Sequence, residues 1–182
     1  MTATKHTIIA LVEDKPGVLN RMASLFRRRG FNIESIAVGH SEVPHLSRMT
    51  IVVDGATTMV EQVRKQLDKV VDVVKVSDIT GFDMIARELA LIKVHATSAT
   101  RSEIIEIVDI FRASIVDVAA DSVTIEVTGD EDKINSLFSL LRGFGIKEIT
   151  RTGRIAMTRG GSSPLTTEGK AAKTPSRRQK SQ

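Results

Sequence analysis

The chain has 182 residues, and 41% of them are hydrophobic, which is enough for one ordinary domain or two small ones. It contains no Trp, no Tyr and no Cys, so its core must be aliphatic, and disulfides, thiolate metal sites and a cysteine nucleophile are excluded. No apolar run approaches the roughly 18 residues of a membrane span, and the polar first residues are not a secretory signal, so we expect a soluble cytoplasmic protein.

The net charge of +4 belongs to the end of the chain. Residues 161–182 hold five basic residues and one acidic residue, which leaves 21 basic and 21 acidic residues in the rest. Because this end is rich in Gly, Ser, Thr, Pro and Lys, we expect residues 159–182 to form a disordered, solubilising tail. The tail lacks aromatic residues for base stacking, and the neutral remainder argues against a nucleic-acid-binding surface.

The first half opens with a β-branched run at residues 7–12, which predicts a strand that ends in a turn. An amphipathic helix follows, with Asp14 as its expected N-cap and Gly30 as the left-handed residue that ends it. Its apolar positions recur at helical spacing: Val18, Met22, Leu25 and Phe26.

Three further strands and a second helix complete this half. The apolar phase of the next run changes near Ser35, which indicates a bulge. Thr58 is expected to open the second helix with a capping box. The expected strands are residues 31–38, 48–53 and 70–76.

The second half repeats the same order. Thr100 and Asp130 are the expected N-caps of its two helices. Its expected strands are residues 89–96, 115–119, 123–128 and 146–150. We therefore predict an α+β protein with two ferredoxin-like βαββαβ domains. The predicted boundaries are 5–78 for the first domain, 79–87 for a linker and 88–158 for the second domain.

The junction of the first strand and the first helix is the candidate ligand site. Unpaired N–H groups and the positive end of the helix dipole suit a carboxylate there. Gly17 lets a ligand approach its backbone closely, and Asn32 could bind either the carboxylate or the ammonium group of an amino acid. Candidates for lining a small apolar pocket are Leu19, Ile33 and Ile36. These patterns alone indicate a ligand-sensing α+β module.

On this frame, the stretch 13–19 (Glu-Asp-Lys-Pro-Gly-Val-Leu) resembles an ACT domain, the amino-acid-sensing module of many regulated biosynthetic proteins. Together with residues 29–35 and 46–51, it resembles the small regulatory subunit of acetolactate synthase (acetohydroxyacid synthase). The second half resembles the C-terminal domain of that family at residues 87–89, 111–113, 115–118, 126–129 and 151–153. The resemblance covers roughly residues 5–160 and leaves the tail outside.

This resemblance implies a non-catalytic subunit of branched-chain amino acid biosynthesis. It implies a homodimer whose ACT sheets join side by side, with a branched-chain amino acid, usually valine, bound between two chains for feedback inhibition. The implied effector residues are Asp14, Gly17, Val18 and Leu19 from one chain and Asn32 and Ile33 from its neighbour. The subunit is also implied to activate a catalytic large subunit, which carries thiamine diphosphate, Mg²⁺ and FAD, so no cofactor is expected on this chain.

One position departs from the family pattern. Many members have Asn where this chain has Asp14, and a carboxylate there would favour the ligand's ammonium group and disfavour its carboxylate. Both the potency of inhibition and the choice of ligand depend on this position. In the second half, residues 96–100 (Ala-Thr-Ser-Ala-Thr) replace the Pro-Gly turn, so no second site is expected there.

Three other functions fit the sequence less well. An independent enzyme is disfavoured because the four His residues lack metal-ligand spacing. A DNA-binding amino-acid sensor would normally carry a helix-turn-helix segment, for which residues 1–6 are too short. The only argument against a free-standing ACT protein of another pathway is the family resemblance of the second half.

Overall fold

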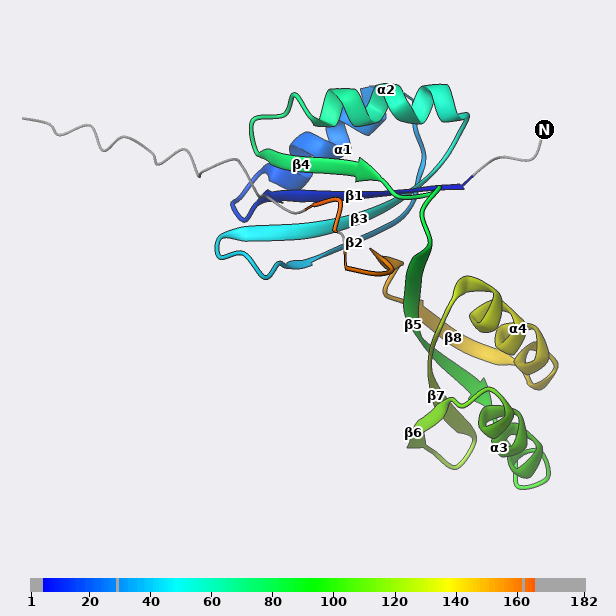
Figure 1. The fold of residues 1–182 in the computed structure, drawn as a ribbon. Helices are drawn as coiled ribbons and strands as arrows, with labels where there is room; N and C mark the ends of the chain where they lie inside the picture. The colour runs from blue at the N-terminus through cyan, green and yellow to red at the C-terminus, as the bar shows by residue number, and fades with distance from the viewer. Residues whose placement is uncertain (1–4, 29, 162, 166–182) are drawn as a thin grey trace, which may run out of the picture.

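The computed structural model describes residues 5–28, 30–161 and 163–165, and it confirms the α+β class with two βαββαβ units (Figure 1). The first unit consists of β1 (Lys5–Glu13), α1 (Val18–Arg28), β2 (Ile33–His40), β3 (Leu46–Asp54), α2 (Thr57–Leu67) and β4 (Val73–Asp78). The second consists of β5 (Met84–His95), α3 (Arg101–Ile110), β6 (Ser114–Val118), β7 (Ser122–Gly129), α4 (Glu131–Leu141), a 3-10 turn (Arg142–Phe144), β8 (Ile146–Arg151) and β9 (Ile155–Thr158). None of the helices in the described part of the chain could span a membrane.

The first sheet is antiparallel, in the order β2-β3-β1-β4, with both helices on one face (Figure 1). Alternate residues of β1 point to opposite faces, because side chains alternate along a strand. Ile8 and Val12 therefore pack against the helices, whereas Ile9 and Leu11 face the other side. The strands β2 and β4 form the two edges of this sheet.

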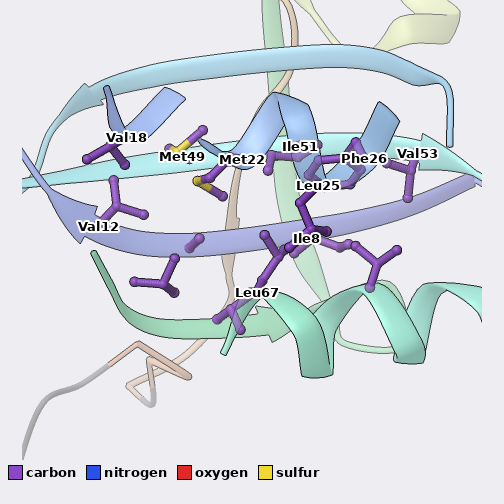
Figure 2. Close-up of a cluster of buried hydrophobic side chains, with 14 of the residues drawn as sticks. Ile8, Val12, Val18, Met22, Leu25, Phe26, Met49, Ile51, Val53 and Leu67 are labelled. Carbon is purple, nitrogen blue, oxygen red and sulfur yellow. The ribbon is translucent and has the colours of Figure 1, made fainter. Parts of the chain in front are cut away.

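The core between this sheet and its helices is aliphatic apart from Phe26. Figure 2 shows side chains of β1, β3, α1 and α2 turned toward one another. Met22, Phe26, Met49 and Leu67 are at most 1% exposed. Burying a side chain of this size stabilises the fold by about 1.5–3 kcal/mol. The predicted helix spacing is confirmed, since Val18, Met22, Leu25 and Phe26 are all buried.

The second sheet has the order β6-β7-β5-β8, which is the same topology as the first. Its core combines β5 and β7 with the inner faces of α3 and α4; Ile92, Ile104, Ile125 and Ile134 are fully buried. The repeat predicted from the sequence is therefore present in the structure.

Two predicted boundaries differ from the structure. The expected linker 79–87 is built into the fold, because Ile79 is fully buried and Met84 to Arg87 pair with β9. The expected disordered tail also begins too early. The Arg159 N–H donates to the Asp83 carbonyl at 2.8 Å, and Leu165 is 5% exposed against the first sheet. The rest of the tail, residues 166–182, lies outside the described residues.

The stretch from α1 to β2 corrects one expectation and confirms two. The helix begins at Val18, and the Gly17 carbonyl accepts from the Arg21 N–H at 3.0 Å, so Asp14 is not its N-cap. Gly30 has a φ of 70° and ends α1 as predicted. The predicted bulge in β2 is also present, at the register shift between Ile33 and Ser35.

The other helix starts are mixed. Asp130 caps α4 as predicted, since its side chain accepts from the Lys133 N–H at 2.9 Å. The capping box at Thr58 is wrong, because α2 begins one residue earlier and Ala56 precedes it. Thr100 does precede α3, but its hydroxyl accepts from the Thr97 N–H and not from a helical N–H.

Candidate effector site

The turn between β1 and α1 leaves an open backbone surface at Gly17. This residue is exposed, has a φ of 91°, and would have no neighbour within 4 Å of an added Cβ atom. The N–H groups of the first turn of α1 have no acceptor within the helix. The side chain of Val18 is 4% exposed and belongs to the core, whereas that of Leu19 is 51% exposed. Val18 therefore offers a ligand only its backbone, and Leu19 offers an apolar side chain.

A buried carboxylate anchors this turn. Asp72, immediately before β4, is 1% exposed, and its side chain pairs with Lys15 at 2.8 Å and with Arg21. Its carbonyl also accepts from the Glu13 N–H at 2.9 Å. The hydrogen bond from Lys15, with the charge of Arg21, holds the pKa of the Asp72 carboxyl below its usual range.

Sequence reasoning missed this anchor. Its only signal is an acidic residue among four valines, at residues 70–74.

Asp14, in the turn between β1 and α1, contacts the hairpin between β2 and β3. Its own N–H donates to the His45 carbonyl at 2.9 Å. Its carboxylate is 3.3 Å from the His40 Nδ1, so the two form an ion pair when His40 is protonated. A protonated His40 would therefore offset the negative charge that distinguishes Asp14 from Asn.

The residues expected from the neighbouring chain lie at the start of the edge strand β2. Asn32 is exposed, and Ile36 is 40% exposed. The side chain of Ile33 is half-buried and packs against the first core, so its backbone is the part that faces outward.

The two sets of candidate residues lie at opposite ends of one sheet. In the sheet register, Ile33 of β2 pairs with Val53 of β3, which pairs in turn with His6 of β1. Glu13, at the other end of β1, pairs with Leu46. The seven residue steps from His6 to Glu13 correspond to roughly 23 Å at about 3.3 Å per residue. One chain therefore does not bring Gly17 and Asn32 together. Any site that uses both needs a second chain.

No metal centre is found in the described ranges, where His, Asp and Glu form no group of three that could hold an ion. Of the four His residues, His6 is 4% exposed and its Nδ1 lies 3.1 Å from the Asp78 carboxylate. His45 takes a positive φ in the β2–β3 hairpin.

Comparisons with known protein families match both halves. A family model described as the small subunit of acetolactate synthase matches residues 87–160. A second model, described as an AHAS small subunit-like ACT domain, matches residues 8–75.

Similar proteins carry the same description over nearly their whole length. The chain is 60% identical over 156 residues to the probable acetolactate synthase small subunit of Archaeoglobus fulgidus, covering 86% of this chain and 98% of that one. It is 49% identical over 160 residues to the acetolactate synthase small subunit of Mycobacterium bovis, covering 88% and 95%. A crystal structure of the acetolactate synthase small subunit from Thermotoga maritima has a TM-score of 0.80 and 43% identity, and covers 87% of this chain and 99% of that one.

Proposed function

Since this chain belongs to the acetolactate synthase small-subunit family and has an N-terminal ACT domain, we propose that it senses a branched-chain amino acid for a catalytic large subunit. Its relatives are named as small subunits, the regulatory component and not the catalytic one. In this proposal valine binds between two ACT domains and inhibits the cytoplasmic holoenzyme, which this chain also activates. Thiamine diphosphate, Mg²⁺ and FAD belong to the large subunit.

The edge position of β2 supports a shared site. β2 runs parallel to β1, because both pair antiparallel with β3. In an antiparallel pairing of β2 with β2 of a second copy, centred on the middle of both strands, Asn32 of that copy lies beside His40. His40 pairs with Ser47, which also pairs with Val12 of β1. His40 therefore lies at the end of the sheet that carries Gly17. This strand register is the observation that carries the proposal, because it brings together residues that a single chain keeps apart.

The groups that meet in such an interface suit a small zwitterion. The N–H groups at the start of α1 and the amide of Asn32 offer hydrogen bonds, while Leu19 and Ile36 are exposed apolar side chains. One methylene group more or fewer on the ligand changes its binding free energy in an apolar pocket by only about 1–3 kcal/mol. We therefore expect leucine and isoleucine to compete with valine.

A ligand between two chains changes how those chains are held. Its effect is limited to the difference in its affinity for the two arrangements. A coupling free energy of about 1–3 kcal/mol would change the output of the catalytic subunit roughly 5- to 150-fold.

Calorimetric titration with valine tests the effector directly. The wild-type chain should bind valine, Asn32→Ala should bind it at least about tenfold more weakly, because a hydrogen bond to a charged group is lost, and Gln62→Ala on the exposed face of α2 should bind normally. Equal affinities for the wild type and Asn32→Ala would remove Asn32 from the site. Absence of binding by the wild type would reject valine as the effector.

A further inference from the structure

We propose that the turn Thr152-Gly153-Arg154, seated on β2, couples the occupancy of the effector site to the orientation of the second domain. The inference rests on the proposed function and adds to it a route from the site to the rest of the molecule. It concerns the stretch of β2 that directly follows Asn32 and Ile33.

The turn contacts β2 so closely that only glycine fits. Gly153 has a φ of 82°, and a Cβ atom there would lie 2.9 Å from the Ser35 Oγ and 3.1 Å from the Ile36 carbonyl oxygen. The next residue completes the contact, since the Arg154 N–H donates to the Ser35 Oγ at 2.8 Å. The second domain is thus attached to a residue three positions from Asn32.

A second link starts from the bulge in the same strand. The Glu34 carboxylate lies 2.6 Å from the Lys5 Nζ, and the same ammonium group lies 2.7 Å from the Glu131 Oε1 at the start of α4. Glu131 also accepts from the Arg154 Nη2 at 2.5 Å. Both links from β2 therefore converge on the first residue of α4 and on the turn that precedes β9.

Inside the second domain the turn is fixed by a buried carboxylate. Glu88 of β5 is 8% exposed; its Oε1 lies 3.8 Å from the Arg154 Nε, and its Oε2 accepts from the guanidinium of Arg151, the last residue of β8, at 2.8 Å. A movement of the turn must therefore carry β5 and β8 with it. The turn behaves as a part of the second domain, and its contact with β2 is the joint.

The contact between the turn and β2 is made by directional polar groups, beside an apolar cluster in which Ala156 of β9 packs with Ile9 and Leu11 of β1. A cavity of about 360 Å³ lies between β2 and the turn; it is lined by residues that include Glu34, Ile36, Val52, Glu131 and Arg151. Polar links across a partly open space give this contact less rigidity than close packing would, while the apolar cluster keeps β9 on the first sheet. A shift of β2 on effector binding can then tilt the second domain, provided that the effector prefers one tilt.

The test compares two glycines with the same backbone conformation. Gly160 has a φ of 81° and no atom within 4 Å of an added Cβ, so Gly160→Ala brings similar backbone strain without touching β2. Amide hydrogen exchange of α4 and β8 is measured with and without valine on the full-length chain, beside calorimetric titration of each variant. We expect the wild type and Gly160→Ala to show a valine-dependent change in protection. Gly153→Ala should bind valine within about threefold of the wild type and lose most of that change.

A valine-dependent change that persists in Gly153→Ala would overturn the inference. So would loss of valine binding by this variant, because the turn would then shape the site itself. Failure of the wild type to bind valine would instead reject the proposed function, and this inference with it. If Gly153→Ala does not fold, Glu131→Gln takes its place, with Glu148→Gln, an exposed partner of Lys93, as its control. Glu131→Gln should reduce the change and Glu148→Gln should not; equal behaviour of the two would contradict the proposal.

Discussion

Asp14 carries a negative charge at a position where the family resemblance leads us to expect Asn. Its carboxylate lies at the end of the sheet that carries Gly17, and its one ion-pairing partner among the described residues is His40, which is 87% exposed and charged only when protonated. Replacing Asp14 by Asn should therefore strengthen valine binding, because it removes a negative charge near the ligand's carboxylate. A repulsion of about 1 kcal/mol corresponds to a roughly fivefold change in Kd.

Titration of Asp14→Asn with valine at low and high salt measures this change. The gain should shrink at high salt, since ions screen exposed charges. A weaker affinity for Asp14→Asn would mean that Asp14 binds the ligand's ammonium group instead. The surface variant Asp109→Asn, on α3 of the second domain, is the matched control.

Asp72 has a structural role in the same site. Its carboxylate pairs with Lys15 and Arg21, which come from the turn and from α1. Asp72→Asn should lower the thermal midpoint of unfolding and weaken valine binding, because the turn loses both ionic contacts to a buried group. Circular dichroism melts and calorimetry check the two effects, and Asp68→Asn on the exposed end of α2 should show neither. An unchanged melt would refute the anchoring role.

At the scale of elements, the edge strand β2 has to serve both the dimer and the site. Val38 is 45% exposed on this edge, and Ile105, 39% exposed on α3, is a comparable apolar residue far from it. Val38→Lys should weaken self-association at least about tenfold, because charges on an edge strand oppose pairing with another strand. Ile105→Lys should leave it unchanged.

Sedimentation velocity over a dilution series checks the prediction for Val38→Lys. The association constants of the two variants are compared with that of the wild type. If Val38→Lys and the wild type associate equally, the dimer is not formed through β2.

The elements also show where sequence reasoning succeeds. Helical spacing identified the buried face of α1, and the change of phase near Ser35 identified the bulge, because both are local properties of the pattern. The role of residues 84–87 was missed, since their partner β9 comes some seventy residues later and no local pattern reveals that pairing. Leu165 was missed for the same reason: a single apolar residue in a polar segment does not indicate which surface will bury it.

The candidate site was foreseen only in its local parts. Proline and glycine at residues 16–17 predicted the turn, and Gly17 does take a positive φ. The anchor at Asp72 and the attachment of Gly153 to Ser35 were not predictable, because each joins residues more than fifty positions apart. That Asn32 and Gly17 lie at opposite ends of the sheet also required the strand register.

At the scale of the whole molecule, the link between the two domains should depend on pH. The hydrogen bond from Lys5 lowers the pKa of Glu131 below 4.5, and the hydrogen bonds from Glu131 and Glu34 raise the pKa of Lys5 above 10.5. The contribution of Glu131 is thus complete above its ordinary pKa and is lost as the pH falls through the lowered value. The contribution of Lys5 is complete below 10.5 and is lost as the pH rises through the raised value.

Small-angle scattering across an acid titration checks this dependence. We expect the distance between the domains to become more variable as the pH falls below the ordinary pKa of Glu131, 4.5. Asp72 also has a lowered pKa, so its protonation contributes to the acid response as well. The contribution of the joint is the part of that response that Glu131→Gln lacks. An identical titration for Glu131→Gln and the wild type would exclude this link.

The central claim is that each effector site is built from two chains, and subunit mixing tests it most directly. Asn32→Ala removes the contribution of one chain, and Leu19→Asp removes that of the other, so each homodimer should bind valine at least about tenfold more weakly than the wild type. A mixed dimer contains one intact site and one doubly altered site, so exchange of subunits should restore binding to about a quarter of all sites. Calorimetry after mixing measures this recovery, with subunit exchange confirmed by mass spectrometry. Exchange without any recovery of valine binding would contradict the account.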